Sequence, residues 1–253
     1  MKLLIAVMTC HSASSKDAPE RARDNHLNRL DFIRKTWGAN ATCDYRFFMG
    51  RGSVRSPYTD EVFLDCGDSY YETAFKVKAI CAWALTQGYD ALFKCDDDTF
   101  VCSERLVCAG FENKEFVGWK IPPSDENHPV TYPWGGPGYF LNTRMMKLAA
   151  SDPYPTSKPD GDTRDRCNTY EDGWIGRVAL DAGINLVHDT RLRCIRYSSA
   201  PSFDHGYGIG QNVLKHAPHI DNDCISACEL TGELMLEVHS KFNERLCKPC
   251  TTQ

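Results

Sequence analysis

The sequence predicts an α/β protein whose central sheet is mostly parallel and flanked by helices. Strand-like apolar runs and helix-like runs follow one another over residues 2–95, and this succession is typical of a parallel sheet. The chain has 253 residues, of which 42% are hydrophobic and 25% charged. These proportions are those of a globular protein with a substantial core.

The first part of the chain contains four predicted strands and two predicted helices. In order, they are a strand at residues 2–10, a helix at 21–37, strands at 45–50 and 61–66, a helix at 71–88 and a strand at 90–95. Leu27, Leu30 and Ile33 recur every three residues, which places them on one face of the first helix. Gly88 is expected to end the second helix, because glycine readily adopts the left-handed conformation found there.

After residue 120 the pattern loosens. Two Pro- and Gly-rich stretches, residues 120–139 and 151–165, are expected to be long loops. Helices are expected at residues 143–151 and 172–183, followed by a strand at 184–189. Long loops of this kind often form ligand sites or lids.

Three adjacent carboxylates, Asp96, Asp97 and Asp98, follow the predicted strand at residues 90–95. Ligands of parallel sheets bind beyond the carboxyl ends of the strands, so an active site is expected at this position. Residues i and i+2 of an extended segment point the same way. Asp96 and Asp98 can therefore face one ligand while Asp97 turns to a backbone or basic partner. Two carboxylates suit Mn²⁺ or Mg²⁺, which can also bridge a diphosphate.

Other interpretations of the triplet are an acidic turn or helix cap, an EF-hand and a phosphatase. An EF-hand beginning at Asp96 is excluded, because Phe100, Val101 and Val107 stand where calcium-binding or turn residues are required. A phosphatase of the haloacid dehalogenase type is the weaker alternative. It needs Thr or Val in place of Phe100 and usually carries its acids on the first strand rather than the fourth.

Five stretches of the chain together resemble one known family. They are LDFIRKTWG, DCGDSYYETAFKVKAICAW, FKCDDDTFV, YPWGGPGYFLN and YEDGWIGRVALDAGI. In this order they resemble the motifs of the β-1,3-galactosyltransferase and Fringe-like family of inverting glycosyltransferases, from Leu3 to about Gly210. The resemblance implies a Rossmann-like sheet of the GT-A type, a UDP-sugar donor, a carbohydrate acceptor and a divalent metal, Mn²⁺ or Mg²⁺.

The resemblance also implies a role for each acid of the triplet. Asp98 is expected to bind the metal directly, and Asp96 to contact the ribose or sugar of the donor and to share the metal site. Asp97 would help to hold that site. A metal-binding histidine is expected near the end of the domain, where His205 is our choice and His188 the alternative.

Sugar transfer makes two chemical demands on such a site. The leaving diphosphate must be stabilised, which a metal does as a Lewis acid, and the acceptor hydroxyl must lose its proton to a general base on the opposite face. A single displacement then inverts the anomeric centre without an enzyme nucleophile. The resemblance assigns the base to Asp172, with Glu171 beside it in support, although acids at this position also cap helices.

Further contacts with the donor are expected outside the acidic motifs. Gly136 and Gly138 would let the backbone approach the donor sugar, because they carry no Cβ, and Trp134 can stack on a sugar ring. A plain turn is the alternative for this stretch. Arg34, Lys76 and Lys94 are candidates for phosphate contacts, although lone basic residues are more often solvated.

The last part of the chain is expected to be a cysteine-rich extension, residues 216–253, packed on a catalytic domain of residues 1–215. Its paired cysteines suggest a structural zinc site with four ligands, namely Cys224, Cys228, Cys247 and Cys250. Two disulfides would suit an extracellular protein, and isolated thiols are the third possibility.

Charge and hydropathy limit which partners the protein is expected to bind and where in the cell it is expected. The net charge of -5 and the lack of a Lys/Arg-rich block argue against a nucleic-acid surface. The run LLIAVM is far shorter than the roughly 18 residues of a transmembrane helix, and it lacks the cleavage region of a signal peptide. A cytoplasmic location is therefore expected, or the Golgi lumen if the chain is part of a longer, anchored protein.

The leading hypothesis is a metal-dependent inverting glycosyltransferase. It would move a hexose or N-acetylhexosamine, with galactose favoured, from a UDP-sugar to a glycan hydroxyl, in a β-1,3 linkage. The alternative from another class is a catalytically silent module of the same fold that binds a nucleotide or sugar.

Overall fold

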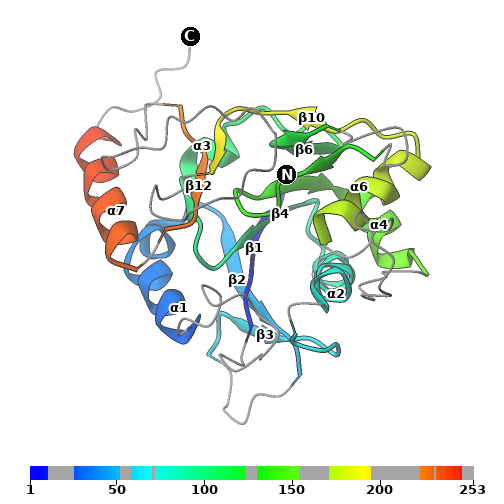
Figure 1. Ribbon diagram of the computed structural model, residues 1–253. Coiled ribbons are helices and arrows are strands. Elements are labelled where there is room, and N and C mark those ends of the chain that lie inside the picture. The colour runs from blue at the N-terminus through cyan, green and yellow to red at the C-terminus, as the bar shows by residue number, and fades with distance from the viewer. Residues whose placement is uncertain are drawn as a thin grey trace, which may run out of the picture.

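The computed structural model describes residues 1–10, 26–51, 58–69, 72–122, 130–153, 171–194, 223–230 and 232–246, apart from the side chains of residues 26, 27, 194 and 242–246. Within these ranges the chain forms a mixed α/β structure around a seven-stranded sheet (Figure 1). The predicted fold class, a mostly parallel sheet flanked by helices, is confirmed.

The strands of the central sheet lie in the order β10-β6-β9-β4-β1-β2-β3. Their bounds are β1 (Leu3–Met8), β2 (Asp44–Met49), β3 (Glu61–Phe63), β4 (Ala91–Asp96), β6 (Phe116–Gly118), β9 (Tyr139–Asn142) and β10 (Val187–His188). Neighbouring strands are parallel except for β9, which runs antiparallel to β4 and β6. The carboxyl ends of β1, β2, β3 and β4 therefore lie along one edge of the sheet.

Strand β1 shows why the sheet forms here. All six of its residues are apolar, and all but Met8 are fully buried. Leu3, Ile5 and Val7 belong to the core on one face of the sheet, whereas Leu4 and Ala6 belong to the core on the other. This alternation has the period of two that a strand imposes, and a strand that is apolar at every position requires helices on both faces.

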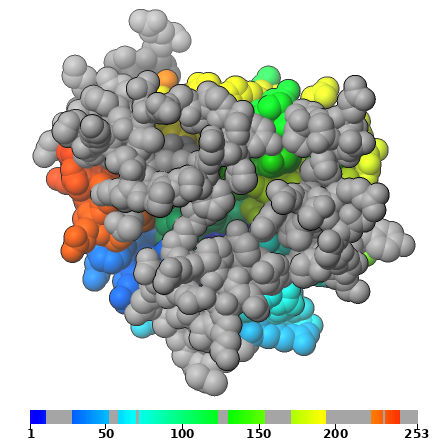
Figure 2. Space-filling model, viewed as in Figure 1, coloured from blue at the N-terminus to red at the C-terminus, as the bar shows by residue number. Residues whose placement is uncertain are grey.

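Helices cover both faces of the sheet. They are α1 (His26–Lys35), α2 (Thr73–Thr86), α3 (Ser103–Val107), α4 (Thr143–Ser151), α6 (Glu171–Asp181) and α7 (Gly232–Leu246), with a 3₁₀ turn η2 at Trp37–Asn40. Helices α1 and α7 lie side by side on one face (Figures 1 and 2). Helices α2, α4 and α6 lie on the other (Figure 1). Helix α2 ends just before Gly88, whose φ of 71° is the left-handed conformation expected there.

The short strands are where the prediction from sequence was wrong. Residues 120–139 were expected to be a loop, but they contain β7 (Lys120–Ile121) and β8 (Tyr132–Pro133), which pair with each other, and β9 begins at Tyr139. Proline and glycine obscured these strands, since Pro133 ends an edge strand and Gly138, with a φ of 95°, allows the sharp entry into β9. The strand expected at residues 184–189 is limited to β10.

The described residues near the C-terminus belong to the same core as the sheet. Strand β12 (Ser226–Cys228) pairs with β11 (Leu192–Cys194) and β5 (Phe100–Val101). Ile225, Ala227 and Met235 are buried in one cluster with β1 and α1. None of the helices in the described ranges is long and apolar enough to cross a membrane.

Candidate active site

The acid triplet forms a turn at the carboxyl end of β4. The strand ends at Asp96, and the Thr99 N–H donates to the Asp96 carbonyl at 3.2 Å. The chain thus leaves the extended conformation at Asp97, so a turn rather than strand alternation separates the three side chains. The three side chains nevertheless differ as expected, because two are partly exposed and the middle one is buried. The side chains of Asp96 and Asp98 are 35% and 27% exposed, whereas that of Asp97 is 5% exposed.

Asp97 is bound by two residues from the first part of the chain. Arg29 of α1 donates to it at 2.9 Å, and the Thr9 hydroxyl, just beyond β1, donates at 2.6 Å. The Arg29 guanidinium also lies 3.7 Å from Asp98. A backbone or basic partner was expected for Asp97, but the sequence did not single out Arg29. The available signal was its position one turn before the buried Ile33, on the same side of the helix.

Lys94 joins the triplet to a distant part of the chain. Its side chain is fully buried, and its Nζ lies 2.7 Å from Asp96 Oδ1 and 2.6 Å from Glu171 Oε1. Nζ also donates to the Gly135 carbonyl at 3.3 Å. One ammonium thus brings the end of β4, the start of α6 and the glycine-containing loop together.

The loop of residues 134–138 is fixed through three successive carbonyls. Nζ of Lys94 donates to Gly135 O, the Thr99 hydroxyl to Gly136 O at 2.8 Å, and the Ser226 hydroxyl to Pro137 O at 2.6 Å. Because three successive carbonyls of this segment are bound by side chains from other elements, the loop is held firmly against the triplet.

Glu171 and Asp172 differ in what their carboxylates can do. Glu171 is buried and paired with Lys94, so it is poorly placed to accept a substrate proton. Asp172 is half-buried and accepts the Gly173 N–H at 2.8 Å. Burial and the charge of Glu171 raise the pKa of Asp172 to about 7, against the opposing effects of the Gly173 and Gly135 N–H groups and Lys94. A carboxylate with a pKa near neutrality suits a general base.

The two partly exposed acids of the triplet, Asp96 and Asp98, have raised pKa values. Burial and the charge of Asp97 raise the pKa of Asp98 to about 6, and Glu229 adds to this effect while Arg29 opposes it. The pKa of Asp96 is raised by burial, which outweighs the opposing charge of Lys94; its exposure to solvent moderates the shift. Burying an ionised carboxylate next to other negative charges costs free energy. A bound cation would offset that cost.

Glu229 is a residue near the triplet that the sequence did not reveal. It has a φ of 62°, which is uncommon for a residue other than glycine. The N–H of the next residue, Leu230, donates to the Asp98 carbonyl at 2.9 Å. The segment after β12 is therefore attached to the triplet, a long-range contact that has no local signal in the sequence.

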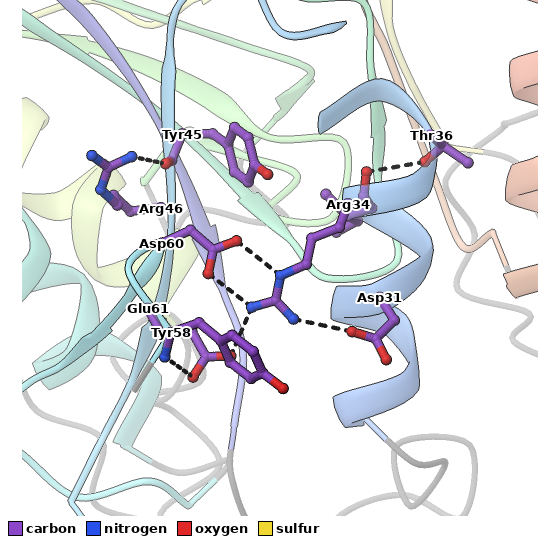
Figure 3. A network of polar contacts seen from close by, with 9 residues as sticks. Asp31, Arg34, Thr36, Tyr45, Arg46, Tyr58, Asp60 and Glu61 are labelled. Carbon is purple, nitrogen blue, oxygen red and sulfur yellow. Dashed lines mark hydrogen bonds and ion pairs between the residues drawn. The ribbon is translucent and has the colours of Figure 1, made fainter. Parts of the chain in front are cut away.

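Arg34 is bound within the protein. Its guanidinium donates to three carboxylates, at 3.1 Å from Asp31, 2.8 Å from Asp60 and 2.8 Å from Glu61 (Figure 3). The guanidinium also lies over the rings of Phe47 and Tyr58, 4.9 and 4.6 Å from their centroids. These contacts tie α1 to β2 and β3, and they account for Arg34 without a phosphate.

Lys76 also has a structural explanation. It is buried, donates to the Thr9 carbonyl at 2.7 Å and pairs with Asp68 at 2.6 Å. Asp68 in turn accepts the Gly50 N–H at 2.7 Å. Lys76 thereby links α2 to the carboxyl ends of β1 and β2, and it supports Thr9, which binds Asp97.

Gly138 is required by contacts within the protein, and Gly136 lies where an added Cβ would be crowded. A Cβ on Gly136 would lie 3.1 Å from Cys228 Sγ, and one on Gly138 would lie 2.5 Å from the Lys94 carbonyl. Trp134 is half-buried, and its backbone N–H donates to the Trp119 carbonyl at 2.7 Å. Contacts of these three residues with a donor sugar stay predictions.

The histidine and cysteine candidates lie partly outside the described residues. His188 ends β10, three strands from β4, and its Nδ1 accepts the Lys120 N–H at 3.0 Å, so the structure does not bring it to the triplet. His205 lies outside the described residues, as do two members of the proposed zinc quartet, Cys247 and Cys250. The other two are buried, Cys224 just before β12 and Cys228 at its end.

Substitution of Gly135 by Ala is expected to disturb the site directly. A Cβ there would lie 2.5 Å from Glu171 Oε1, and Glu171 cannot yield easily because Lys94 holds it. We expect the start of α6 to shift, with a loss in the melting temperature of roughly 2–10 °C, as overpacking of about 1–3 kcal/mol implies. Circular dichroism melting and the rate of the reaction proposed below are the measurements.

A matched control for this substitution is Gly176→Ala on α6. A Cβ on Gly176 would lie 2.7 Å from the Thr131 carbonyl, so it is also crowded, but by residues 131 and 132 rather than by an acid. The control should lose stability and retain its rate. Equal rates in the two variants would show that the contact between Gly135 and Glu171 does not matter for the reaction.

No protein-family profile and no curated sequence matches the chain. A CMP:2-keto-3-deoxy-manno-octonic acid synthetase complexed with CTP aligns with a TM-score of 0.47 and 9% identity, over 75% of this chain and 89% of that one. A glycosyltransferase involved in the glycosylation of the major capsid of PBCV-1 aligns with a TM-score of 0.45 and 12% identity, over 94% and 98%. Likenesses of this size do not assign an activity.

Proposed function

We propose that this protein is a metal-dependent inverting glycosyltransferase that uses a UDP-sugar. The sugar is a hexose or N-acetylhexosamine, with galactose favoured, and the product is a glycan with a β-1,3 linkage. The sugar and linkage follow from the resemblance of five motifs to the β-1,3-galactosyltransferase and Fringe-like family. The general reaction is supported by the geometry of the acids as well.

The observation that supports the proposal most is that acids from two separate motifs bind the same ammonium group, that of Lys94. Asp96 of FKCDDDTFV and Glu171 of YEDGWIGRVALDAGI both bind Lys94 Nζ, at 2.7 and 2.6 Å. Asp172, the acid proposed as the base, is therefore held next to the segment proposed to bind the diphosphate. Had the two motifs lain on different edges of the sheet, a single displacement reaction at this site would be impossible.

The acids at the carboxyl edge of the sheet suit a divalent cation whose remaining coordination positions are filled by substrate phosphates and water. Within the described ranges no three His, Cys, Asp or Glu side chains converge on a point that could hold a metal. Mg²⁺, however, is usually held by one or two carboxylates together with substrate phosphates and water. Asp98 would be the direct ligand, and Asp96, already paired with Lys94, would face the donor. When bound, the metal would neutralise charge on the leaving diphosphate.

Asp172 would act on the acceptor. Its carboxylate would take the proton from the attacking hydroxyl as the bond to the anomeric carbon forms and the bond to UDP breaks. The start of α6 favours negative charge, which helps to keep Asp172 ionised before the reaction. Glu171 would not transfer a proton, because its carboxylate is buried and paired.

A panel of UDP-sugars with Mn²⁺ tests the proposal. Each donor is incubated with the full chain, and release of UDP is measured without an acceptor and with simple β-galactosides or other glycans. At least one donor should be hydrolysed slowly and turned over faster with an acceptor, and EDTA should abolish both reactions. Failure of every donor to release UDP would overturn the proposal.

A further inference from the structure

Lys94 has no N–H left for a substrate. A lysine ammonium has three N–H donors, and three acceptors surround this one, namely Asp96 Oδ1, Glu171 Oε1 and the Gly135 carbonyl, at 2.7, 2.6 and 3.3 Å. The side chain is also fully buried. A lysine next to an acid triplet suggests a phosphate contact, but this one is directed into the protein.

The placement of Lys94 follows from its position in the strand. Lys94 and Asp96 are two residues apart on β4, so their side chains lie on the same face of the sheet. Lys94 pairs across the sheet with Tyr139 of β9, and its Nζ lies 5.6 Å from the centre of that ring. This face is the one that α6 covers, so the ammonium lies between the strand and the start of the helix.

The ion pair that holds Glu171 also fixes the orientation of Asp172. Successive residues of an α-helix are about 100° apart around its axis, so a helix whose first residue is held cannot rotate without breaking that contact. The Glu171 carboxylate is held by Lys94 on one side and crowded by the Gly135 backbone on the other, where an added Cβ would lie 2.5 Å away. The orientation of Asp172 relative to Asp96 is therefore set through Lys94 and Glu171.

We propose that Lys94 and Glu171 form a positioning pair that sets Asp172 against the acid triplet. The inference rests on the function proposed above and deepens it, since it assigns Glu171 to placement rather than proton transfer. Lys94 is in this view neither a phosphate ligand nor a simple core lysine. It fixes the relative position of the two reacting groups.

The test compares Lys94→Met with the double variant Lys94→Met/Glu171→Gln. The single variant leaves a buried carboxylate unpaired, so its melting temperature should fall by roughly 10 °C, and turnover at pH 7 should fall by about 100-fold. The double variant removes both charges and should regain at least half of the lost melting temperature. Its turnover should stay at least about 10-fold below that of the wild type, because the start of α6 is no longer tied to Asp96.

The pH profile gives a readout that a purely structural role would not change. The titratable groups around Asp172 are the Glu171 carboxylate on its own helix, the Lys94 ammonium on β4 and the neutral Tyr139 phenol on β9. Lys94 lowers the pKa of Asp172. Its loss should therefore move the acidic limb of the kcat/KM profile in Lys94→Met upward, by about one pH unit.

Arg177→Met is a matched control on the same helix. Arg177 pairs with Asp152 at 2.7 Å and with Asp181 at 2.8 Å, so its loss should lower the melting temperature while leaving kcat and the acidic limb unchanged. Turnover of Lys94→Met within about threefold of the wild type, or full recovery of turnover in the double variant, would overturn the inference and leave the proposed function intact. Absence of transfer by the wild type would overturn both.

Discussion

Replacement of Asp172 by Asn is expected to lower the rate of sugar transfer by about 10³-fold, since general base catalysis contributes about 10²–10⁴-fold. The amide has nearly the same shape as the carboxylate and can still accept the Gly173 N–H, so the fold and UDP binding should be retained. Initial rates with saturating donor and acceptor, together with calorimetric titration of UDP, are the measurements. A binding module of the same fold would have no transfer to lose.

The control for this substitution is Asp181→Asn at the other end of α6. Asp181 is exposed and pairs with Arg177, and surface pairs of this kind contribute at most about 1 kcal/mol. Its rate should equal that of the wild type. If Asp172→Asn kept more than about a tenth of the activity, Asp172 would not be the base.

Replacement of Asp98 by Asn is expected to abolish the dependence of transfer on Mn²⁺. The amide is a weaker ligand for a hard cation, so the rate at any attainable Mn²⁺ concentration should fall by at least about 100-fold. The variant should remain folded. The pKa of Asp98 is raised above its usual value by burial and by Asp97, so its charge is a cost to the folded state at neutral pH. The melting temperature in EDTA should therefore stay equal or rise by a few degrees.

Asp97→Asn provides the contrast within the same triplet. Asp97 is buried and bound to Arg29 and Thr9, so loss of its charge removes an ion pair with the Arg29 guanidinium. A drop in the melting temperature is expected. If Asp98→Asn were the destabilised variant and Asp97→Asn the one with altered Mn²⁺ dependence, the assignment of the two acids would be reversed.

The parts of the fold that could be predicted are those with local patterns. Strand β1 is apolar along its whole length and α2 ends at a glycine, so both were evident from the sequence. Strand β9 was missed because its entry runs through glycine and proline, and its pairing partners are β4 and β6. Strand β12 is paired with a two-residue strand more than a hundred residues earlier, a contact that local propensity cannot reveal.

The candidate site, like the fold, could be predicted only in part from the sequence. The acids themselves could be found, because a run of carboxylates after a buried strand is unusual and the motifs occur in order. Their partners could not, because Arg29, Thr9 and Glu229 come from separate parts of the chain and reach the triplet only in the folded state. Arg34 and Lys76 were candidates for phosphate contacts as isolated basic residues, but ion pairs with carboxylates explain the position of both.

Calorimetric titration of UDP, in Mn²⁺ and in EDTA, tests the central claim most directly. That claim is that the triplet binds a diphosphate through a divalent cation beside Asp172. The account predicts that Mn²⁺ tightens UDP binding by at least about tenfold for the wild type, a coupling of about 1.4 kcal/mol, and has no effect on Asp98→Asn. Equal affinity of the wild-type protein for UDP in Mn²⁺ and in EDTA would contradict it.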